Sequence, residues 1–203
     1  MILSIKFNHV LAWIETEIEW SLDDLRNVVK NYVSNELDLV GFIKGYAYDV
    51  DIRRVVNPVL NLDFTFGIDT PCIVSRNKEI ELLPRLKELQ EKTGGPEGLY
   101  ISRCLADLVS AMKHPDDTGF YCYRAIESLR QHCIHKFNLS KDNKTNQWKK
   151  IRELTKCSGD ELRKIQKAAE PVRHGEVVKG TSEDRKTLFM VTWDIVDAYL
   201  DAI

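Results

Sequence analysis

Long apolar runs are missing from this sequence. No stretch approaches the roughly 18 apolar residues that a membrane-spanning helix needs. The N-terminus also lacks the basic start followed by a long apolar run that is typical of a signal peptide. Hydrophobic residues make up 43% of the 203 positions and charged residues 30%, as in an ordinary globular chain. We therefore expect a cytoplasmic protein with no membrane partner.

Short paired cysteine spacings are missing as well. The five cysteines form an odd set without a paired motif: Cys72, Cys104, Cys122, Cys133 and Cys157. A metal site at His132-Cys133-Ile134-His135 would need a further cysteine, and this spacing fits no zinc template because neighbouring helix positions point apart. Gly94-Gly95 lacks the other residues of a phosphate-binding loop. We expect buried free thiols in a reducing compartment, and neither a metal nor a cofactor.

Charge is unevenly distributed, although the formal net charge is only −2. Residues 1–70 carry 6 basic and 11 acidic side chains, a net charge of −5, whereas residues 124–175 carry 13 basic and 6 acidic side chains, a net charge of +7. Such a basic segment attracts polyanions, nucleic acid first among them. The alternative is a solvated surface of helices and loops that has no ligand.

Alternation with a period of two dominates the first part of the chain. Apolar and polar residues alternate over four segments, which we interpret as strands: 3–7, 13–20, 46–52 and 60–68. Asn57-Pro58 predicts the turn of an antiparallel hairpin. A helix is expected to begin after the capping residue Ser21 and to end near Asn35, and the apolar run at 72–74 is expected to complete the sheet.

Helical spacing replaces this alternation in the second part. Thr93-Gly-Gly-Pro96 is the clearest break, and it predicts a boundary between a β-rich domain with one or two helices, 1–94, and an α-rich domain, 95–203. The expected helices cover 79–92, 97–113, 118–137, 146–156, 158–170 and a last segment capped by Thr181. The helix over 118–137 is apolar on more than one face, which is typical of the centre of a bundle. The predicted fold class is α+β: a small antiparallel sheet with one helix, then an α-helical bundle.

Arg173, His174 and Gly175 stand together just after Pro171, where a helix is expected to end. A histidine can move a proton near neutral pH, and an arginine can hold two phosphate oxygens at once. The pair suits cleavage of a phosphodiester, in which a proton moves and negative charge must be stabilised. The alternative is a helix end in which Arg173 binds a carboxylate such as Glu127 and His174 caps carbonyl groups.

Arg124 and Glu127 are three positions apart on the predicted central helix, so they share one face. Charged side chains on so apolar a helix should have a partner or line a cleft. The simplest interpretation is that Glu127 binds and orients Arg173. The alternative is an intrahelical pair between Arg124 and Glu127 at the edge of the bundle.

The segment 97–203 resembles the HEPN superfamily, the higher-eukaryote and prokaryote nucleotide-binding domains. The resemblance lies in three motifs: Tyr123-Arg-Ala-Ile-Glu-Ser-Leu129, Arg173-His174-Gly175, and a last helix that opens Thr181-Ser-Glu-Asp-Arg185 and runs through Trp193-Asp-Ile-Val-Asp-Ala-Tyr-Leu200. The segment is most similar to abortive-infection and Apea-like members, which can carry an N-terminal β-rich extension.

The resemblance implies an α-helical bundle that forms a homodimer. Active members are metal-independent endoribonucleases, and the motifs of two subunits form one RNA-cleaving cleft. Their signature is an arginine followed a few residues later by a histidine. Here Lys167 stands seven residues before His174, and a lysine binds phosphate as a point charge rather than with two aligned donors. Other members are inactive dimerisation or ligand-binding modules.

Two main hypotheses follow from these residues. In the first, the protein is a metal-independent endoribonuclease of antiviral defence or toxin type, with His174 as general acid/base, Arg173 and Lys167 on the phosphate, and Glu127 orienting Arg173. The residues expected to follow the RNA backbone are Arg124, Lys149, Lys150, Arg163 and Lys164. In the second, the bundle is a non-catalytic module for dimerisation or for binding a ligand or nucleic acid. A third, antitoxin-like role would be the neutralisation of another protein.

Overall fold

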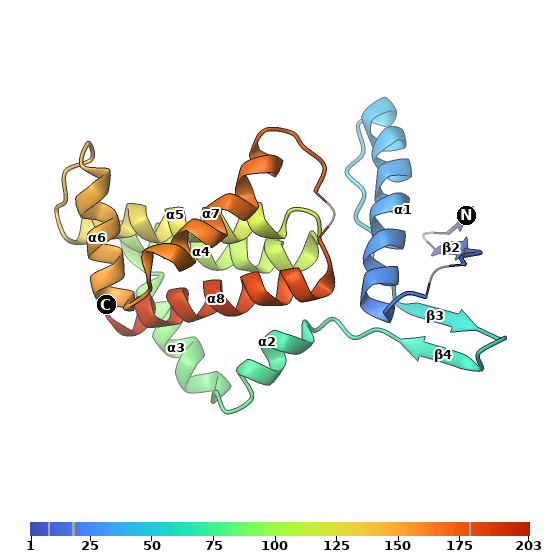
Figure 1. Cartoon of the computed structure of the whole chain (residues 1–203), viewed down its shortest axis with the longest axis horizontal. Coiled ribbons are helices and arrows are strands. Elements are labelled where there is room, and N and C mark those ends of the chain that lie inside the picture. The colour runs from blue at the N-terminus through green and yellow to red at the C-terminus, as the bar shows by residue number, and fades with distance from the viewer. Residues whose placement is uncertain (8, 18, 179) are drawn as a thin grey trace. The chain divides into compact units, whose positions relative to one another are not determined.

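The computed structural model describes residues 1–7, 9–17, 19–178 and 180–203. The chain divides into two compact units between Ile68 and Asp69, and both are drawn in Figure 1. The first unit contains two small antiparallel sheets and one long helix, whereas all regular structure in the described part of the second unit is helical. The predicted α+β class, with its β-containing N-terminal part and helical C-terminal part, is confirmed.

Two β-hairpins and a helix make up the first unit. In chain order they are β1 (Ile2–Lys6), β2 (His9–Trp13), α1 (Leu22–Lys44), β3 (Arg54–Asn57) and β4 (Leu62–Thr65). β1 pairs with β2 and β3 with β4, both antiparallel. The turn predicted at Asn57-Pro58 is confirmed, because the Asn57 side chain accepts hydrogen bonds from the amides of Val59 and Leu60. Ser21 caps α1 as predicted, accepting a hydrogen bond from the Asp24 amide.

Three strand predictions for this part of the chain are wrong. Of the segment 13–20 only Trp13 lies in a strand; residues 14–17, 19 and 20 have neither helix nor strand, and residue 18 lies outside the described residues. α1 does not end near Asn35 but continues to Lys44, and Gly45 ends it in a left-handed conformation with φ of 72°. Residues 46–52 follow as irregular chain and not as the predicted strand. Residues 72–74 are helical, because Pro71 begins a helix there. Alternating residues form a strand only where a neighbouring strand can pair with them.

Seven helices form the described regular structure of the second unit. They are α2 (Pro71–Arg76), α3 (Leu82–Lys92), α4 (Gly95–Lys113), α5 (Thr118–Lys136), α6 (Lys144–Thr155), α7 (Gly159–Arg173) and α8 (Ser182–Asp201). The break at Thr93-Gly-Gly-Pro96 separates α3 from α4 within this unit. Thr181 caps α8 in a reciprocal capping box with Asp184, as the sequence predicts.

α5 is the central helix of the bundle. It packs against α4, α6, α7 and α8, and its buried residues face more than one direction, as predicted. α5 and α7 lie close together at Gly119, where an added methyl group would lie 2.5 Å from the backbone oxygen of Ala168. A larger residue at position 119 would therefore require α5 and α7 to move apart.

Three of the five thiols lie in the core of the bundle: Cys104, Cys122 and Cys133. Burial raises the pKa of each thiol, that of Cys122 to about 11. The thiolate is the reactive form of cysteine, so these side chains act as small apolar core residues. Cys72 and Cys157 are half-buried at the edge of the core.

Ion pairs attach α2 and α3 to one side of α8. The Arg76 guanidinium lies 2.8 Å from Asp194 and 2.6 Å from Asp197. The Arg85 guanidinium lies 3.1 Å from Asp197 and 3.0 Å from Asp201. Two arginines thus face three carboxylates. These ion pairs bind α2 and α3 to α8, and all three helices belong to the second unit.

Candidate functional site

Two adjoining hollows lie among α5, α6 and α7. The larger has a volume of about 500 Å³ and the smaller about 170 Å³. The larger is lined by Phe120, Tyr123, Arg124, Glu127, Arg130, Lys144, Trp148, Gln166 and Arg173. Tyr123, Trp148 and Gln166 line the smaller hollow too, so these three side chains form the wall that the hollows share. We call the two hollows together the α5–α7 groove.

The larger hollow gathers three of the residues singled out in the sequence: Arg124, Glu127 and Arg173. Its lining includes four basic side chains and one acidic side chain, together with three aromatic rings. A basic surface with interleaved aromatic rings can hold phosphates by charge and bases by stacking.

Glu127 is held by its own helix rather than by Arg173. It accepts hydrogen bonds from Tyr123 Oη at 2.8 Å and from Arg130 Nε at 3.0 Å. Burial, followed by this hydrogen bond to Glu127, raises the pKa of the Tyr123 hydroxyl to about 12. No ion pair joins Arg173 to Glu127 among the residues that the structure describes, and Arg173 instead lies over the Tyr123 ring, 5.7 Å from its centre. The partner predicted for Glu127 is therefore wrong, because Arg130 is one helical turn away and takes its place.

Arg124 also has a different partner from the one considered in the sequence. Its Nη2 lies 2.9 Å from Asp107 Oδ1 on α4, and its guanidinium lies over the Phe120 ring, 5.3 Å from the ring centre. The Asp107 side chain is only 6% exposed and its Oδ2 has no hydrogen-bond partner in the described structure. Burial raises the pKa of Asp107, while Arg124 opposes this rise. The buried Asp107 carboxylate thus fixes the position of the Arg124 guanidinium, which lines the larger hollow.

α7 continues through Pro171 and ends at Arg173, so the predicted helix end is wrong. A proline in the last turn removes only one N–H, and the carbonyl that loses its partner belongs to the exposed Lys167. His174 caps the helix, its amide donating to Glu170 O and Pro171 O, and Gly175 follows with φ of 81°. Lys167 and His174 are seven positions apart on this helix, about two turns, so they lie on one side of α7.

The remaining predicted site residues lie outside the larger hollow. Arg163 lines the smaller one and pairs with Asp160 at 2.5 Å. Lys149 and Lys150 on α6 both lie within 4.0 Å of Glu153. Neither they nor Lys164, Lys167 or His174 are among the lining residues of either hollow. The structure therefore places Arg173 at the groove and its neighbour His174 at the exposed end of α7.

The lining residues that the sequence does not predict as site residues include Arg130, Lys144, Trp148, Arg152 and Gln166. Trp148 and Arg152 are four positions apart on α6, a spacing that puts an aromatic ring and a guanidinium on one helix face. This spacing is visible in the sequence, but which face of α6 meets α5 and α7 is not.

Family models match both parts of the chain. Residues 86–203 match the C-terminal domain, and residues 1–66 the N-terminal domain, of a family described as a domain of unknown function, DUF8168. The chain belongs to the DUF8168 family. No curated protein and no solved structure matches it. The groove lies wholly within the part matched by the DUF8168 C-terminal domain.

The chemistry open to this DUF8168 chain at the groove is set by arginine, lysine and aromatic side chains. Over the described residues, no group of three or more His, Cys, Asp and Glu side chains could hold a metal ion. No helix among these residues is both long and apolar enough to span a membrane. What the lining residues can do is attract an anion, orient it with two-donor arginine contacts and stack on a flat ring.

Proposed function

We propose that the helical unit of this DUF8168 chain is a HEPN-like bundle that binds RNA in the α5–α7 groove. The observation that carries the proposal is the meeting of Arg124, Lys144 and Arg173 with three aromatic rings around one hollow of about 500 Å³. Arg124 and Arg173 are each placed over an aromatic ring, at 5.3 and 5.7 Å, so their charges are held at the hollow instead of moving freely in solvent. RNA phosphates are the anions that this combination suits.

Fluorescence anisotropy with a labelled RNA strand tests this proposal. Arg173→Gln and Arg124→Gln should each weaken binding, and each should reduce the slope of log K against log salt concentration by roughly 0.7 for one lost phosphate contact. Lys87→Gln is the matched control: it removes the same charge from α3, and Lys87 lines neither hollow. Equal binding by all three variants and the unchanged protein would contradict the assignment of the groove.

A second proposed function is metal-independent cleavage of the bound RNA, of the defence or toxin type found among HEPN-like proteins. The continuation of α7 through Pro171 favours it, since Lys167 and His174 then share one side of the helix that presents Arg173 to the groove. His174 would act as general acid/base, and Arg173 and Lys167 would stabilise the phosphate. In this mechanism two copies of the bundle would form a homodimer that brings a pair of such helix ends to one strand.

Incubation of the protein with RNA in EDTA separates cleavage from binding. We expect cleavage that disappears in His174→Ala while RNA affinity is retained. Intact RNA, or cleavage that His174→Ala leaves unchanged, would instead support the non-catalytic binding module. Light scattering during size-exclusion chromatography measures whether the chain is a dimer under the same conditions.

A further inference from the structure

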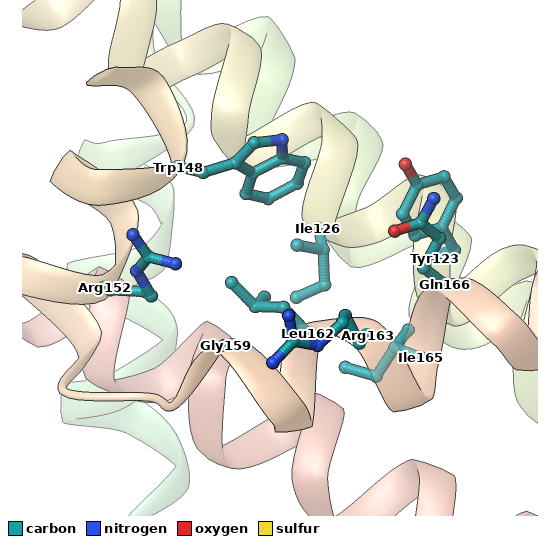
Figure 2. A pocket seen from close by; sticks show the side chains of 9 residues that line it. All are labelled: Tyr123, Ile126, Trp148, Arg152, Gly159, Leu162, Arg163, Ile165 and Gln166. Atoms are coloured by element: carbon teal, nitrogen blue, oxygen red, sulfur yellow. The ribbon is translucent and has the colours of Figure 1, made fainter. Parts of the chain in front are cut away.

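The smaller hollow of the α5–α7 groove differs in chemistry from the larger one. Ile126 and Ile165, which are almost completely buried, and Leu162 give it an apolar floor. Figure 2 shows Trp148 at the top of the view, Tyr123 and Gln166 together at the right, and Ile126 and Leu162 below Trp148. At about 170 Å³ it has room for several water molecules, each of which occupies about 30 Å³ in the liquid. A flat, largely apolar ring would therefore fit it better than a bare phosphate.

Two arginines converge at the edge of this hollow. A methyl group added to Gly159 would lie 3.4 Å from Arg152 Nη1 and 3.8 Å from Arg163 Nη2, so both guanidinium groups lie close to the same backbone position. Figure 2 shows Arg152 on the side of the pocket away from Tyr123 and Gln166, and Arg163 below Leu162. Arg163 pairs with Asp160, whereas Arg152 has no ion pair among the described residues. The charge of Arg152 is not offset by an ion pair among the described residues, so this edge of the hollow can attract an anion.

We propose that the smaller hollow is a subsite for one unstacked nucleobase of an RNA strand, with an adjacent phosphate of that strand held by Arg152 and Arg163. The base lies against Trp148 and Tyr123, and Gln166 offers both a donor and an acceptor to its edge. The strand then continues over the shared wall into the larger hollow, where Arg124, Arg173 and Lys144 meet the next phosphates. This inference rests on RNA binding at the groove and adds which form of RNA is bound.

The arrangement selects single-stranded RNA. In a duplex every base is paired and stacked, and removing one from the stack costs a few kcal/mol. A single strand exposes its bases at little cost, and stacking on an aromatic side chain then adds to the affinity. A polyanion that has no bases can use the arginines but not the apolar floor.

Binding by three ligands tests the subsite: a short labelled oligouridine strand, a blunt-ended RNA duplex without a loop, and inorganic polyphosphate as a polyanion without bases. Trp148→Ala should weaken binding of the single strand by about fivefold to a hundredfold, the range for loss of one stacked base. The Trp148→Ala variant should bind the duplex and polyphosphate as tightly as the unchanged protein does. Trp148→Phe, which keeps a ring at the position, should retain most of the affinity. Arg152→Gln should weaken single strand and polyphosphate alike.

The outcomes separate this subsite from RNA binding as such. If Arg173→Gln weakens binding of the single strand while Trp148→Ala has no effect on it, the groove binds RNA and the base subsite is wrong. If the unchanged protein binds neither RNA nor polyphosphate, both proposals are wrong. If uridine monophosphate competes as well as the oligouridine strand does, the pocket serves a free nucleotide, and its assignment to an RNA strand is wrong.

A second measurement does not depend on the folding of any variant. Ultraviolet irradiation of the unchanged protein with RNA that contains thiouridine joins a base directly to side chains in contact with it. We expect mass spectrometry to find the crosslink at Trp148 or Tyr123. Crosslinks confined to peptides outside α5, α6 and α7 would overturn the subsite.

Discussion

Arg130 is the most fully engaged side chain at the groove. Its guanidinium donates to Glu127 Oε2 from Nε at 3.0 Å and to Gln147 Oε1 from Nη1 at 2.5 Å. Gln147 is itself buried and donates to the backbone oxygens of Ser140 and Lys141, so the loop before α6 depends on the same chain of bonds. Arg130 therefore stabilises the groove rather than offering its charge to a ligand.

Replacing Arg130 by methionine should destabilise the protein strongly. The variant leaves Glu127 partly buried without its cation and Gln147 without its donor, a loss of about 3 kcal/mol in the free energy of unfolding. Urea denaturation measures this loss. Lys149→Met, which removes an exposed lysine from α6, should change stability by no more than about 0.5 kcal/mol. Similar values for both variants would show that the buried network contributes nothing.

His132 supplies a pH dependence of stability. Its Nδ1 lies 2.8 Å from Tyr199 Oη in the core, and burial, with a smaller effect of Lys136, lowers its pKa from the usual 6.5. Between these two pKa values the unfolded chain binds a proton that the folded protein does not. The free energy of unfolding should therefore fall as pH is lowered from 6.5 towards the folded-state pKa, and this contribution should level off below it.

Chemical denaturation at a series of pH values measures this effect. His132→Asn cannot titrate, so its stability should lack that part of the decrease on acidification. If the variant and the unchanged protein lose stability in parallel below pH 6.5, another group is responsible.

At the scale of elements, the crossing of α5 and α7 controls the groove. Gly119→Ala places a methyl group 2.5 Å from Ala168 O and 3.0 Å from Ala168 Cβ, so the two helices must move apart. We expect a loss of about 1–3 kcal/mol in stability, which is typical of overpacking, together with weaker RNA binding as the groove widens. Gly180→Ala is the matched control, since its methyl group would meet nothing within 4 Å. Thermal denaturation and anisotropy measure the two effects.

The helices of the bundle were largely predictable, because their apolar spacing and capping residues are local signals. Thr181 and Ser21 both cap the helices that they were expected to begin. Strand prediction failed where it depended on a partner: residues 13–20 alternate, but among those that the structure describes only Trp13 pairs with a neighbouring strand. Pro171 failed as a helix terminator for a different reason. In the last turn the missing N–H of Pro171 leaves only one carbonyl, that of the exposed Lys167, without its helical hydrogen bond. The helix can therefore continue past the proline at little cost in stability.

The groove was predictable only in part. Arg124, Glu127 and Arg173 were selected from the sequence, and all three line the larger hollow. Their partners were not predictable, because an arginine such as Arg130 or a carboxylate such as Asp107 becomes a partner through helix packing rather than through sequence distance. The smaller hollow was not predictable for the same reason, since residues from three helices line it.

At the scale of the whole molecule, the two units differ in their cores. All residues of the main apolar cluster belong to the second unit, whereas the buried apolar side chains described in the first are Val29, Val33 and Phe66. Residues 69–203 alone should therefore fold and unfold in one cooperative thermal transition. Residues 1–68 alone should show none, because so small a core cannot offset the loss of chain entropy. Circular dichroism on the separate fragments tests both statements.

A shorter fragment tests the ion pairs that join α2 and α3 to α8. Residues 86–203, the extent of the matched C-terminal domain, lack both Arg76 and Arg85 and leave three carboxylates of α8 without these partners. This fragment should melt at a lower temperature than residues 69–203, and the difference should shrink in high salt as screening increases. Identical melting temperatures would show that α2 and the start of α3 do not stabilise the bundle.

The buried thiols provide a way to measure how often the helical bundle opens. A thiol reagent in solution can reach Cys104, Cys122 and Cys133 only when the helices separate, while the half-buried Cys72 and Cys157 provide a faster internal reference. The labelling rate of the slow group measures how often the core opens, with no probe added to the chain. A molecule that occupies the groove binds the closed form and must lower that rate. A collection of small RNAs could thus be ranked by the protection that each gives to Cys122, which stands next to Tyr123 in α5.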